Sequence, residues 1–227
     1  MRLRYKALLL DFYGTLVKDD GALVERVISH VGELSPLNEA VVGVRSRWYE
    51  LMGMMCRDAH GNSFQTQRHI EVASLQMVLD EYQVKLDAGE LCEDIFAYLA
   101  RPEPYDDVAP FLTKVGVPVC IVSNIDDTEI NSAIGHLGWS FPFVVTSERC
   151  RAYKPRAEMF SAALSLLNVS ANDVLHIGDS PSADVRGAQG CGIDVAWLNR
   201  NNRSLTGQRP VSSVAGFGDL ATRLGIG

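Results

Sequence analysis

The sequence predicts an α/β protein: a doubly wound parallel sheet with helices on both faces and a helical unit inserted after the first strand. Three observations predict this fold class. Residues 7–10 form an unbroken apolar run, which is typical of a central strand that is covered on both faces. From about residue 21 to residue 100, apolar residues recur with a helical period. From residue 106 onward, strand-like and helix-like segments alternate, as βα units do.

The inserted unit is expected over residues 18–104 as a small helical cap, so the core would comprise residues 1–17 and 105–227. The two prolines of residues 101–105 disfavour both helix and strand, and they indicate a linker there. Within the insertion, four segments show helical periodicity and end near Gly, Ser or Pro. These helices are expected at residues 22–34, 37–55, 64–82 and 86–99.

The part of the core that follows the cap shows a regular alternation of β-rich runs and amphipathic stretches. Such an alternation indicates a parallel sheet, because the helices connect the end of each strand to the start of the next. Strands are expected at residues 117–122, 141–146, 174–177 and 193–198. Helices are expected at residues 108–115, 127–137, 156–167, 182–189 and 218–224.

Composition excludes several classes of function. The 227 residues carry a formal net charge of −7, which argues against a nucleic-acid or membrane partner and leaves a small anionic substrate possible. The five cysteines include no CxxC pair, so we expect neither a disulfide framework nor structural zinc, and a cytoplasmic location. The first apolar run ends in Asp11 rather than at a small-residue cleavage site, so no targeting segment is expected. The oligomeric state is not indicated.

Polar side chains follow the first two strands of the expected core. Asp11 comes directly after residues 7–10, and Ser123 and Asn124 come directly after residues 117–122. The second of these ends leads into a helix start, where a hydroxyl, backbone N–H groups and a positive helix end can bind an anion. Because ligands bind at the carboxyl ends of parallel strands, we expect these three side chains to lie close together.

Two later stretches add a cation and two acids. Lys154 precedes Pro155, which forces the lysine out of helical geometry and opens the next helix. Gly178 and Asp179 end the strand at residues 174–177, and Asp184 follows five residues after Asp179. Each stretch alone is more often a turn, a helix cap or a surface charge. The four stretches together indicate a catalytic site.

In their order and spacing, these four stretches resemble the haloacid dehalogenase-like hydrolase superfamily, in its subclass with a helical cap and a Rossmann-like core. The motifs of that superfamily run in the order nucleophile strand, Ser or Thr strand, lysine and acidic strand end. The resemblance implies that this protein is a hydrolase. The roles implied are nucleophile for Asp11, anion binding for Ser123, charge balance for Lys154, metal binding for Asp179 and support of the site for Asp184.

The resemblance also implies a metal ion, because three carboxylates that lie close together raise one another's pKa unless a cation intervenes. One lysine cannot neutralise three acids, whereas Mg²⁺ binds one or two carboxylates, water and a phosphate oxygen. The expected Mg²⁺ ligands are Asp11, the main-chain carbonyl of Tyr13, Asp179 and water. Asp11 would attack phosphorus to give an aspartyl-phosphate that water then cleaves.

Tyr13 departs from the phosphatase pattern. Phosphatases of the superfamily usually carry a second Asp at this position, and a phenol with a pKa near ~10 is a poor base at neutral pH. The sequence Asp-x-Tyr-Gly-Thr instead resembles 2-haloacid dehalogenases, which attack carbon without a metal through an aspartyl ester. In that alternative, Arg45 would bind the carboxylate or halide of the substrate, and Asn124 also matches.

The later motifs favour the phosphatase. Asp179 beside a carboxylate substrate without a metal would be repulsive, and Phe160 stands where the dehalogenases carry a tyrosine. We therefore expect a Mg²⁺-dependent phosphatase that acts on a small phosphorylated metabolite. The alternatives are a 2-haloacid dehalogenase and a weakly active or non-catalytic phospho-ligand binder. The expected catalytic residues are Asp11, Tyr13 and Lys154, and the expected substrate-binding residues are Thr15, Arg45, Ser123 and Asn124.

Overall fold

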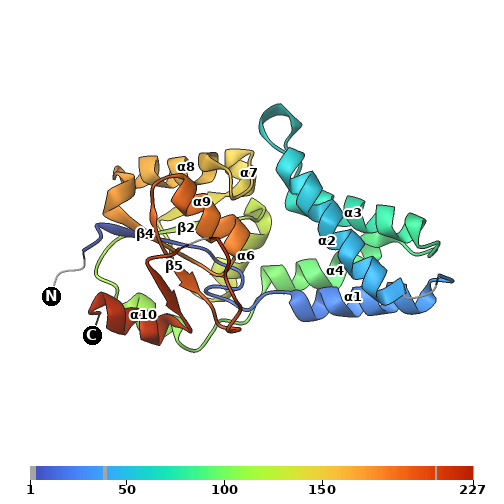
Figure 1. The fold of residues 1–227 in the computed structure, drawn as a ribbon, viewed down its shortest axis with the longest axis horizontal. Coiled ribbons are helices and arrows are strands. Elements are labelled where there is room, and N and C mark those ends of the chain that lie inside the picture. The colour runs from blue at the N-terminus through green and yellow to red at the C-terminus, as the bar shows by residue number, and fades with distance from the viewer. Residues whose placement is uncertain (1–3, 38–39, 208, 227) are drawn as a thin grey trace.

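The structure, a computed structural model, describes residues 4–37, 40–207 and 209–226. Its centre is a six-stranded sheet with the order β3-β2-β1-β4-β5-β6, in which every pair of neighbouring strands is parallel. Helices cover both faces of this sheet (Figure 1), so the predicted α/β fold class is confirmed. The strands are β1 (Ala7–Leu10), β2 (Val119–Ser123), β3 (Phe143–Thr146), β4 (Val174–Gly178), β5 (Asp194–Leu198) and β6 (Ser212–Val214).

Strand β1 is buried along its whole length between β2 and β4. Its side chains alternate between two apolar cores, as the pleat of a strand requires. Leu8 and Leu10 belong to one core, and Ala7 and Leu9 belong to the other. This double burial explains why the strand reads as a continuous apolar run rather than as an alternating one. It also brings Asp11 to the middle of the edge formed by the carboxyl ends of the strands.

Four helices between β1 and β2 form a separate group beside the sheet, called here the helical unit (Figure 1). Its centre is apolar: Trp48 is buried, and its indole N–H donates to Ser74 Oγ at 3.0 Å. One predicted helix began at residue 37, and residues 38–39 lie outside the described residues. The four helices are α1 (Gly21–Leu34), α2 (Ala40–Asp58), α3 (Gln67–Glu81) and α4 (Ala88–Ala100).

The remaining helices belong to the core around the sheet. They are α5 (Val108–Lys114), α6 (Asp127–His136), α7 (Ser147–Cys150), α8 (Ala157–Leu167), α9 (Arg186–Gly190) and α10 (Phe217–Leu224). Short helical turns lie at Gly61–Ser63, Ala171–Asp173 and Pro181–Val185. Within the described ranges, none of the helices combines the length and the hydropathy needed to cross a membrane.

Three details differ from the sequence-based expectation. The helix expected over residues 182–189 is a wide π turn, Pro181–Val185, followed by α9. This turn is held by Asp184, whose carboxylate accepts from the N–H of Ser180. Strand β6 and helix α7 were not expected, because segments of three and four residues are too short to show a period.

The helical unit is attached to the core through the start of α3. The carboxylate of Asp126, which precedes α6, accepts from the N–H groups of Gln67 at 2.9 Å and Arg68 at 3.0 Å. The Arg68 guanidinium donates to Glu129 of α6 at 2.8 Å. An acidic side chain of the core thus satisfies the unpaired N–H groups of a helix in the other unit. This contact fixes the start of α3 against the carboxyl end of β2.

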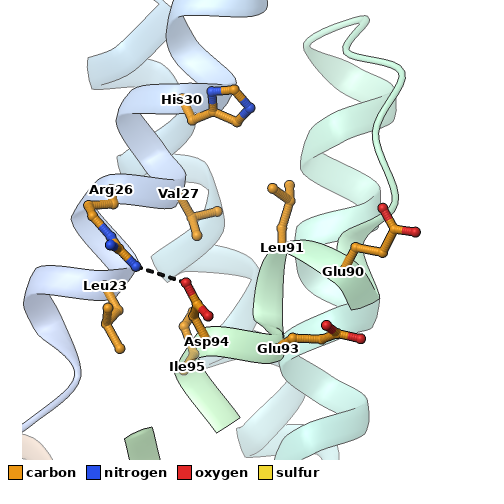
Figure 2. Close-up of a pocket in the computed structure, with 9 residues that line it drawn as sticks. All are labelled: Leu23, Arg26, Val27, His30, Glu90, Leu91, Glu93, Asp94 and Ile95. Carbon is orange, nitrogen blue, oxygen red and sulfur yellow. Dashed lines mark hydrogen bonds and ion pairs between the residues drawn. The ribbon is translucent and has the colours of Figure 1, made fainter. Parts of the chain in front are cut away.

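A groove of about 260 Å³ lies between α1 and α4 of the helical unit (Figure 2). Arg26 on α1 donates to Asp94 on α4 at 3.0 Å across it. The lining residues are Leu23, Arg26, Val27, His30, Glu90, Leu91, Glu93, Asp94 and Ile95, and none of them lines the pocket at the carboxyl ends of the strands that is described below.

Candidate active site

A pocket of about 250 Å³ lies at the carboxyl ends of β1, β2 and β4, which are neighbours in the sheet. The structure therefore brings together polar groups that are far apart in the sequence, as expected for a parallel sheet. Residues of the core and of the helical unit both line it. The lining residues are Asp11, Tyr13, Asp20, Gln67, Leu99, Ser123, Asn124, Lys154, Asp179, Ser180, Ala183 and Asp184.

Lys154 is the central cation of this pocket and is only 5% exposed. Its ammonium donates to Asp11 Oδ1 at 2.7 Å and to Asp184 Oδ1 at 2.6 Å. Burial alone would lower the pKa of Lys154, but the two carboxylates raise it overall, so the side chain stays charged. Asn124 holds the backbone of Lys154 in place, because its Oδ1 accepts from the Lys154 N–H and its Nδ2 donates to the Lys154 carbonyl.

Asp184 is a fully hydrogen-bonded support for that lysine. Besides the ammonium, it contacts His176 Nε2 at 2.9 Å and accepts from the Ser180 N–H at 3.0 Å. Burial alone would raise the pKa of Asp184, but Lys154 and His176 lower it overall. Gly178 makes this packing possible, since a Cβ at that position would collide with the Asp184 carboxyl.

Asp179 is held through its main chain, and its carboxylate projects into the pocket. Trp197 Nε1 and Arg203 Nη2 both donate to the Asp179 carbonyl, at 2.8 and 2.6 Å, and the same guanidinium reaches Oδ2 at 3.2 Å. Burial, together with the charges of Asp11 and Asp184, raises the pKa of Asp179 to about 7. Gly14 adopts a φ of +79°, and a Cβ there would lie 3.0 Å from Asp179 Oδ1.

The donor set of this pocket fits a divalent cation. Carboxylate oxygens of Asp11, Asp179 and Asp184 all lie within 4.8 Å of one another. Asp184 is occupied by its own partners, whereas Asp11 Oδ2 and Asp179 Oδ1 accept no hydrogen bond from the described residues. Burial also raises the pKa of Asp11, against the opposing effect of Lys154. Three carboxylates beside the Lys154 ammonium and the Arg203 guanidinium leave a negative excess that a hard, oxygen-binding cation offsets.

The side chain of Tyr13 lines the pocket, but its hydroxyl is already bonded. The O–H donates to the carbonyl of Leu99, in α4, at 2.6 Å. Burial raises the pKa of the phenol, and the charges of Glu129 and Asp20 raise it further. The phenol therefore stays protonated and ties the loop after β1 to the helical unit, which is a poor arrangement for proton transfer to a substrate.

We expect Tyr13→Phe to lower the free energy of unfolding by about 1 kcal/mol, because one hydrogen bond to Leu99 is lost. The rate of a reaction catalysed in this pocket should change by less than about threefold, since the phenol O–H is already bonded to Leu99 and is poorly placed to donate a proton. Urea unfolding and steady-state kinetics on the same preparation check both values. A hundredfold loss of kcat with unchanged stability would instead make this phenol a catalytic residue.

The other predicted substrate-binding residues have different surroundings. Ser123 lines the pocket, and its hydroxyl makes no hydrogen bond with the described residues. Thr15 is completely buried, its Oγ1 finds no partner among the described residues, and it does not line the pocket. Arg45 forms an ion pair with Glu25 between α2 and α1, and it does not line the pocket either. The structure therefore does not bring Arg45 to the site.

The sequence does not predict several residues of the site, and three of them are polar residues with a direct bearing on its charge and hydrogen bonding. Asp20 and Gln67 line the pocket from the helical unit, and Arg203 binds Asp179 from a polar loop. Asp20 could have been proposed as a site residue from the sequence, because it is the last acid before the first helix. No local pattern distinguishes Gln67 or Arg203 from solvated residues, since their contacts are with distant parts of the chain.

Glu71 is a buried acid of α3, one turn after Gln67. It is 1% exposed, and its Oε2 has no hydrogen-bond partner among the described residues. Burial, with the charge of Asp20, raises the pKa of Glu71 from an ordinary 4.5 to about 8. Between these values the folded state binds more protons than the unfolded chain, so the free energy of unfolding falls as pH rises through this window.

Glu71→Gln should remove this pH dependence. Relative to the wild type, the variant should gain on the order of 3 kcal/mol of stability as pH rises from about 5 to about 8, and little more above that. Urea unfolding across this range checks it, with Glu33→Gln on the exposed surface of α1 as the control. A difference in the free energy of unfolding between variant and wild type that stays constant across this pH range would show that Glu71 titrates normally.

Comparison with known proteins identifies the family of this chain. A family model described as haloacid dehalogenase-like hydrolase matches residues 5–192. The (S)-2-haloacid dehalogenase H-109 of Pseudomonas putida is 26% identical over 125 residues, which cover 52% of this chain and 55% of that protein. The 5-amino-6-(5-phospho-D-ribitylamino)uracil phosphatase YigB of Escherichia coli is 35% identical over 141 residues, which cover 61% of this chain and 58% of that protein.

The chain thus matches little more than half the length of these two curated relatives. Among solved structures, the HAD-hydrolase YfnB of Bacillus subtilis bound to magnesium has a TM-score of 0.76 and 22% identity, and the match covers 98% of this chain and all of that one. This likeness supports the fold. The relatives include both a phosphatase and a dehalogenase, so the chemistry has to be argued from the pocket itself.

Proposed function

The chain belongs to the haloacid dehalogenase-like hydrolases, and from this premise we propose that it is a Mg²⁺-dependent phosphatase of a small phosphorylated metabolite. The proposal depends on the acidic excess of the pocket, where three carboxylates lie within 4.8 Å of one another, two of them pair with the Lys154 ammonium, and the third, Asp179, pairs with the Arg203 guanidinium. This excess suits a metal-bound phosphate, in which the cation offsets the charge of both the protein and the substrate.

Asp11, Asp179 and the main-chain carbonyl of Tyr13 are the residues that would hold Mg²⁺. When bound, the ion supplies positive charge to the phosphate oxygens and orients them for in-line attack. Asp184 is not among the proposed ligands, because Lys154, His176 and Ser180 already occupy its oxygens. It acts instead by fixing the ammonium of Lys154.

Asp11 is the proposed nucleophile. One carboxylate oxygen forms a bond to phosphorus as the bond from phosphorus to the substrate oxygen breaks, and the departing alkoxide takes a proton from water. Water then attacks phosphorus, the bond from phosphorus to Asp11 breaks, and inorganic phosphate leaves. Lys154 donates to Asp11 Oδ1 at 2.7 Å and so fixes the orientation of the carboxylate. The free hydroxyl of Ser123 is placed to donate to a phosphate oxygen.

The helical unit is proposed to act as a cap over this site, with residues 18–104 as the cap and residues 1–17 and 105–227 as the core. Three residues of the cap, Asp20, Gln67 and Leu99, line the pocket. Bonds from Tyr13 to Leu99 and from Asp126 to the start of α3 join the two parts. A cap in this position excludes water from the phosphate and selects the organic part of the substrate.

Dehalogenation is the second candidate, favoured by the Asp-x-Tyr-Gly-Thr sequence and by the dehalogenase relative. It would require a cation for the carboxylate of the haloacid. None of the described residues that line the pocket is an arginine, and the one lysine is already paired with two carboxylates. A carboxylate substrate would therefore be repelled by the remaining acids. A non-catalytic phospho-ligand binder is the third candidate.

The deciding experiment compares p-nitrophenyl phosphate with 2-chloropropionate, each with Mg²⁺ and with a chelator. We expect phosphate release that the chelator abolishes, no halide release under either condition, and no activity in Asp11→Asn. Phosphate release that is unchanged by the chelator would reject the metal-dependent mechanism. Halide release that persists with the chelator would establish the dehalogenase, and no turnover of any ester would favour the binder.

A further inference from the structure

His176 is a polar side chain inside an apolar layer of the core. It lies in β4 between Leu175 and Ile177, and it is 0% exposed. Its ring packs edge to face against Phe160 of α8, with 5.3 Å between the ring centroids. Burial of an imidazole destabilises the folded state unless its nitrogens are hydrogen-bonded, and an apolar side chain would fill this space without that cost. A histidine at this position therefore requires an explanation.

One nitrogen of this imidazole has a partner and the other has none. Nε2 lies 2.9 Å from Asp184 Oδ1, and Nδ1 is buried without a hydrogen-bond partner among the described residues. Burial raises the pKa of Asp184, but Lys154 and His176 together lower it by more, so its carboxylate is ionised and can only accept. Nε2 must therefore carry a hydrogen, as it does in both the neutral Nε2–H tautomer and the imidazolium. The one polar contact of His176 is thus a donation to Asp184.

The Asp184 carboxylate is fixed by three donors. Its Oδ1 accepts from His176 at 2.9 Å and from the Lys154 ammonium at 2.6 Å, and its Oδ2 accepts from the Ser180 N–H at 3.0 Å. His176 and Lys154 thus share one oxygen. The hydrogen bond from His176 partly satisfies the charge of that oxygen, which limits how strongly it attracts the ammonium.

The Lys154 ammonium is itself shared between two carboxylates. It donates to Asp184 Oδ1 at 2.6 Å and to Asp11 Oδ1 at 2.7 Å. Without the bond from His176, Asp184 would be less restrained and would draw the ammonium away from Asp11. A displacement of about 1 Å in a catalytic site can lower a rate about a hundredfold. Since His176 does not line the pocket, it acts through other side chains rather than by contact with a substrate.

We propose that His176 is a positioning residue: by donating from Nε2 to Asp184, it keeps the ammonium of Lys154 in contact with Asp11. The effect on rate rests on the proposed phosphatase function, in which Asp11 is the nucleophile. A role in packing alone requires only a side chain of suitable volume. The positioning role requires a hydrogen-bond donor at the place of Nε2.

Two substitutions of matched length separate the donor from the volume. Glutamine places an N–H donor at about the reach of Nε2, and methionine has a similar shape without a donor. We expect His176→Met to lower kcat on p-nitrophenyl phosphate with Mg²⁺ by at least about tenfold, with KM changed by less than about twofold. His176→Gln should keep kcat within about threefold of the wild type.

Val174→Ala is the control for packing. Val174 lies two residues earlier in β4, so its side chain is on the same side of the sheet as that of His176. The substitution removes apolar contacts but no hydrogen bond, so it should lower the free energy of unfolding and leave kcat near wild type.

Crystal structures of the two His176 variants measure the positioning directly. The distance from Lys154 Nζ to Asp11 Oδ1 should stay within hydrogen-bond range in His176→Gln and exceed about 3.5 Å in His176→Met. An unchanged distance in His176→Met would overturn the inference, as would equal kcat values in the two variants of an active enzyme. If the wild type hydrolyses no phosphate ester, the phosphatase function fails, and the two structures still decide whether His176 positions Lys154.

The wild-type protein provides a further test, which does not depend on whether His176→Met folds. Nitrogen NMR of protein with isotopically labelled histidine shows which ring nitrogen carries a hydrogen, and the His176 signals are those missing in His176→Gln. We expect a hydrogen on Nε2. A hydrogen on Nδ1 alone would overturn the inference, because Nε2 could then not donate to Asp184.

Discussion

Lys154→Met is expected to lower kcat by at least about a thousandfold and the free energy of unfolding by about 3–5 kcal/mol. The ammonium is buried between Asp11 and Asp184, and it donates to both at 2.6–2.7 Å. Methionine fills similar space but leaves two buried carboxylates facing each other without a cation. Asp11, the proposed nucleophile, then loses its orientation, and the folded state loses the charge that offsets its acids.

Kinetics with p-nitrophenyl phosphate and urea unfolding measure the two effects. Lys18→Met is the matched control, because Lys18 is exposed and pairs with Glu103 at the surface; both quantities should stay near wild type. Added Mg²⁺ should restore part of the lost stability, since the ion supplies charge to the same carboxylates. If Lys154→Met unfolds like the wild type and keeps its activity, the lysine is not the central cation of the site.

Asp179→Asn is expected to lower kcat/KM by at least about a hundredfold, because a charged side chain proposed as a metal ligand is replaced by a neutral one. In the absence of metal, however, the same substitution should raise the free energy of unfolding. The pKa of Asp179 is raised to about 7 by burial, Asp11 and Asp184, so above that pH the ionised carboxylate destabilises the metal-free protein. The variant should therefore unfold at higher urea concentration than the wild type when a chelator is present.

When Mg²⁺ is added, the wild type should become more stable than Asp179→Asn. The wild type should gain stability with rising Mg²⁺ as a specifically bound ligand requires, and the variant should gain little. Asp58→Asn, at an exposed position at the end of α2, should respond to Mg²⁺ like the wild type. Equal stabilisation of Asp179→Asn and the wild type by Mg²⁺ would show that Asp179 does not bind the ion.

The core side of the site could be predicted from the sequence because the parallel sheet determines which residues meet there. Asp11, Ser123 and Asp179 each follow a strand with a recognisable apolar run, and strands β1, β2 and β4 are neighbours. Once the strands are parallel, their carboxyl ends must meet at one edge. Lys154 was predicted from its place before Pro155, although its partners Asp11 and Asp184 became clear only in the structure.

The cap side of the site could not be predicted in the same way. Its position depends on contacts between distant segments, such as the bonds from the N–H groups of Gln67 and Arg68 to Asp126. Arg45 illustrates the problem, because its place on a helix does not show which neighbour it meets, and the packing of α1 against α2 gives it Glu25. The hydrogen bond from Tyr13 to Leu99 likewise joins two units that no local pattern relates.

The most direct measurement of the central claim is the chemical state of Asp11 during turnover. The protein is mixed with p-nitrophenyl phosphate and Mg²⁺, quenched in acid and analysed by mass spectrometry of the peptide that contains this residue. We expect phosphate on Asp11 in the wild type, and none with a chelator or in Asp179→Asn. Steady hydrolysis without phosphate on Asp11, or equal phosphorylation in the presence of the chelator, would contradict it.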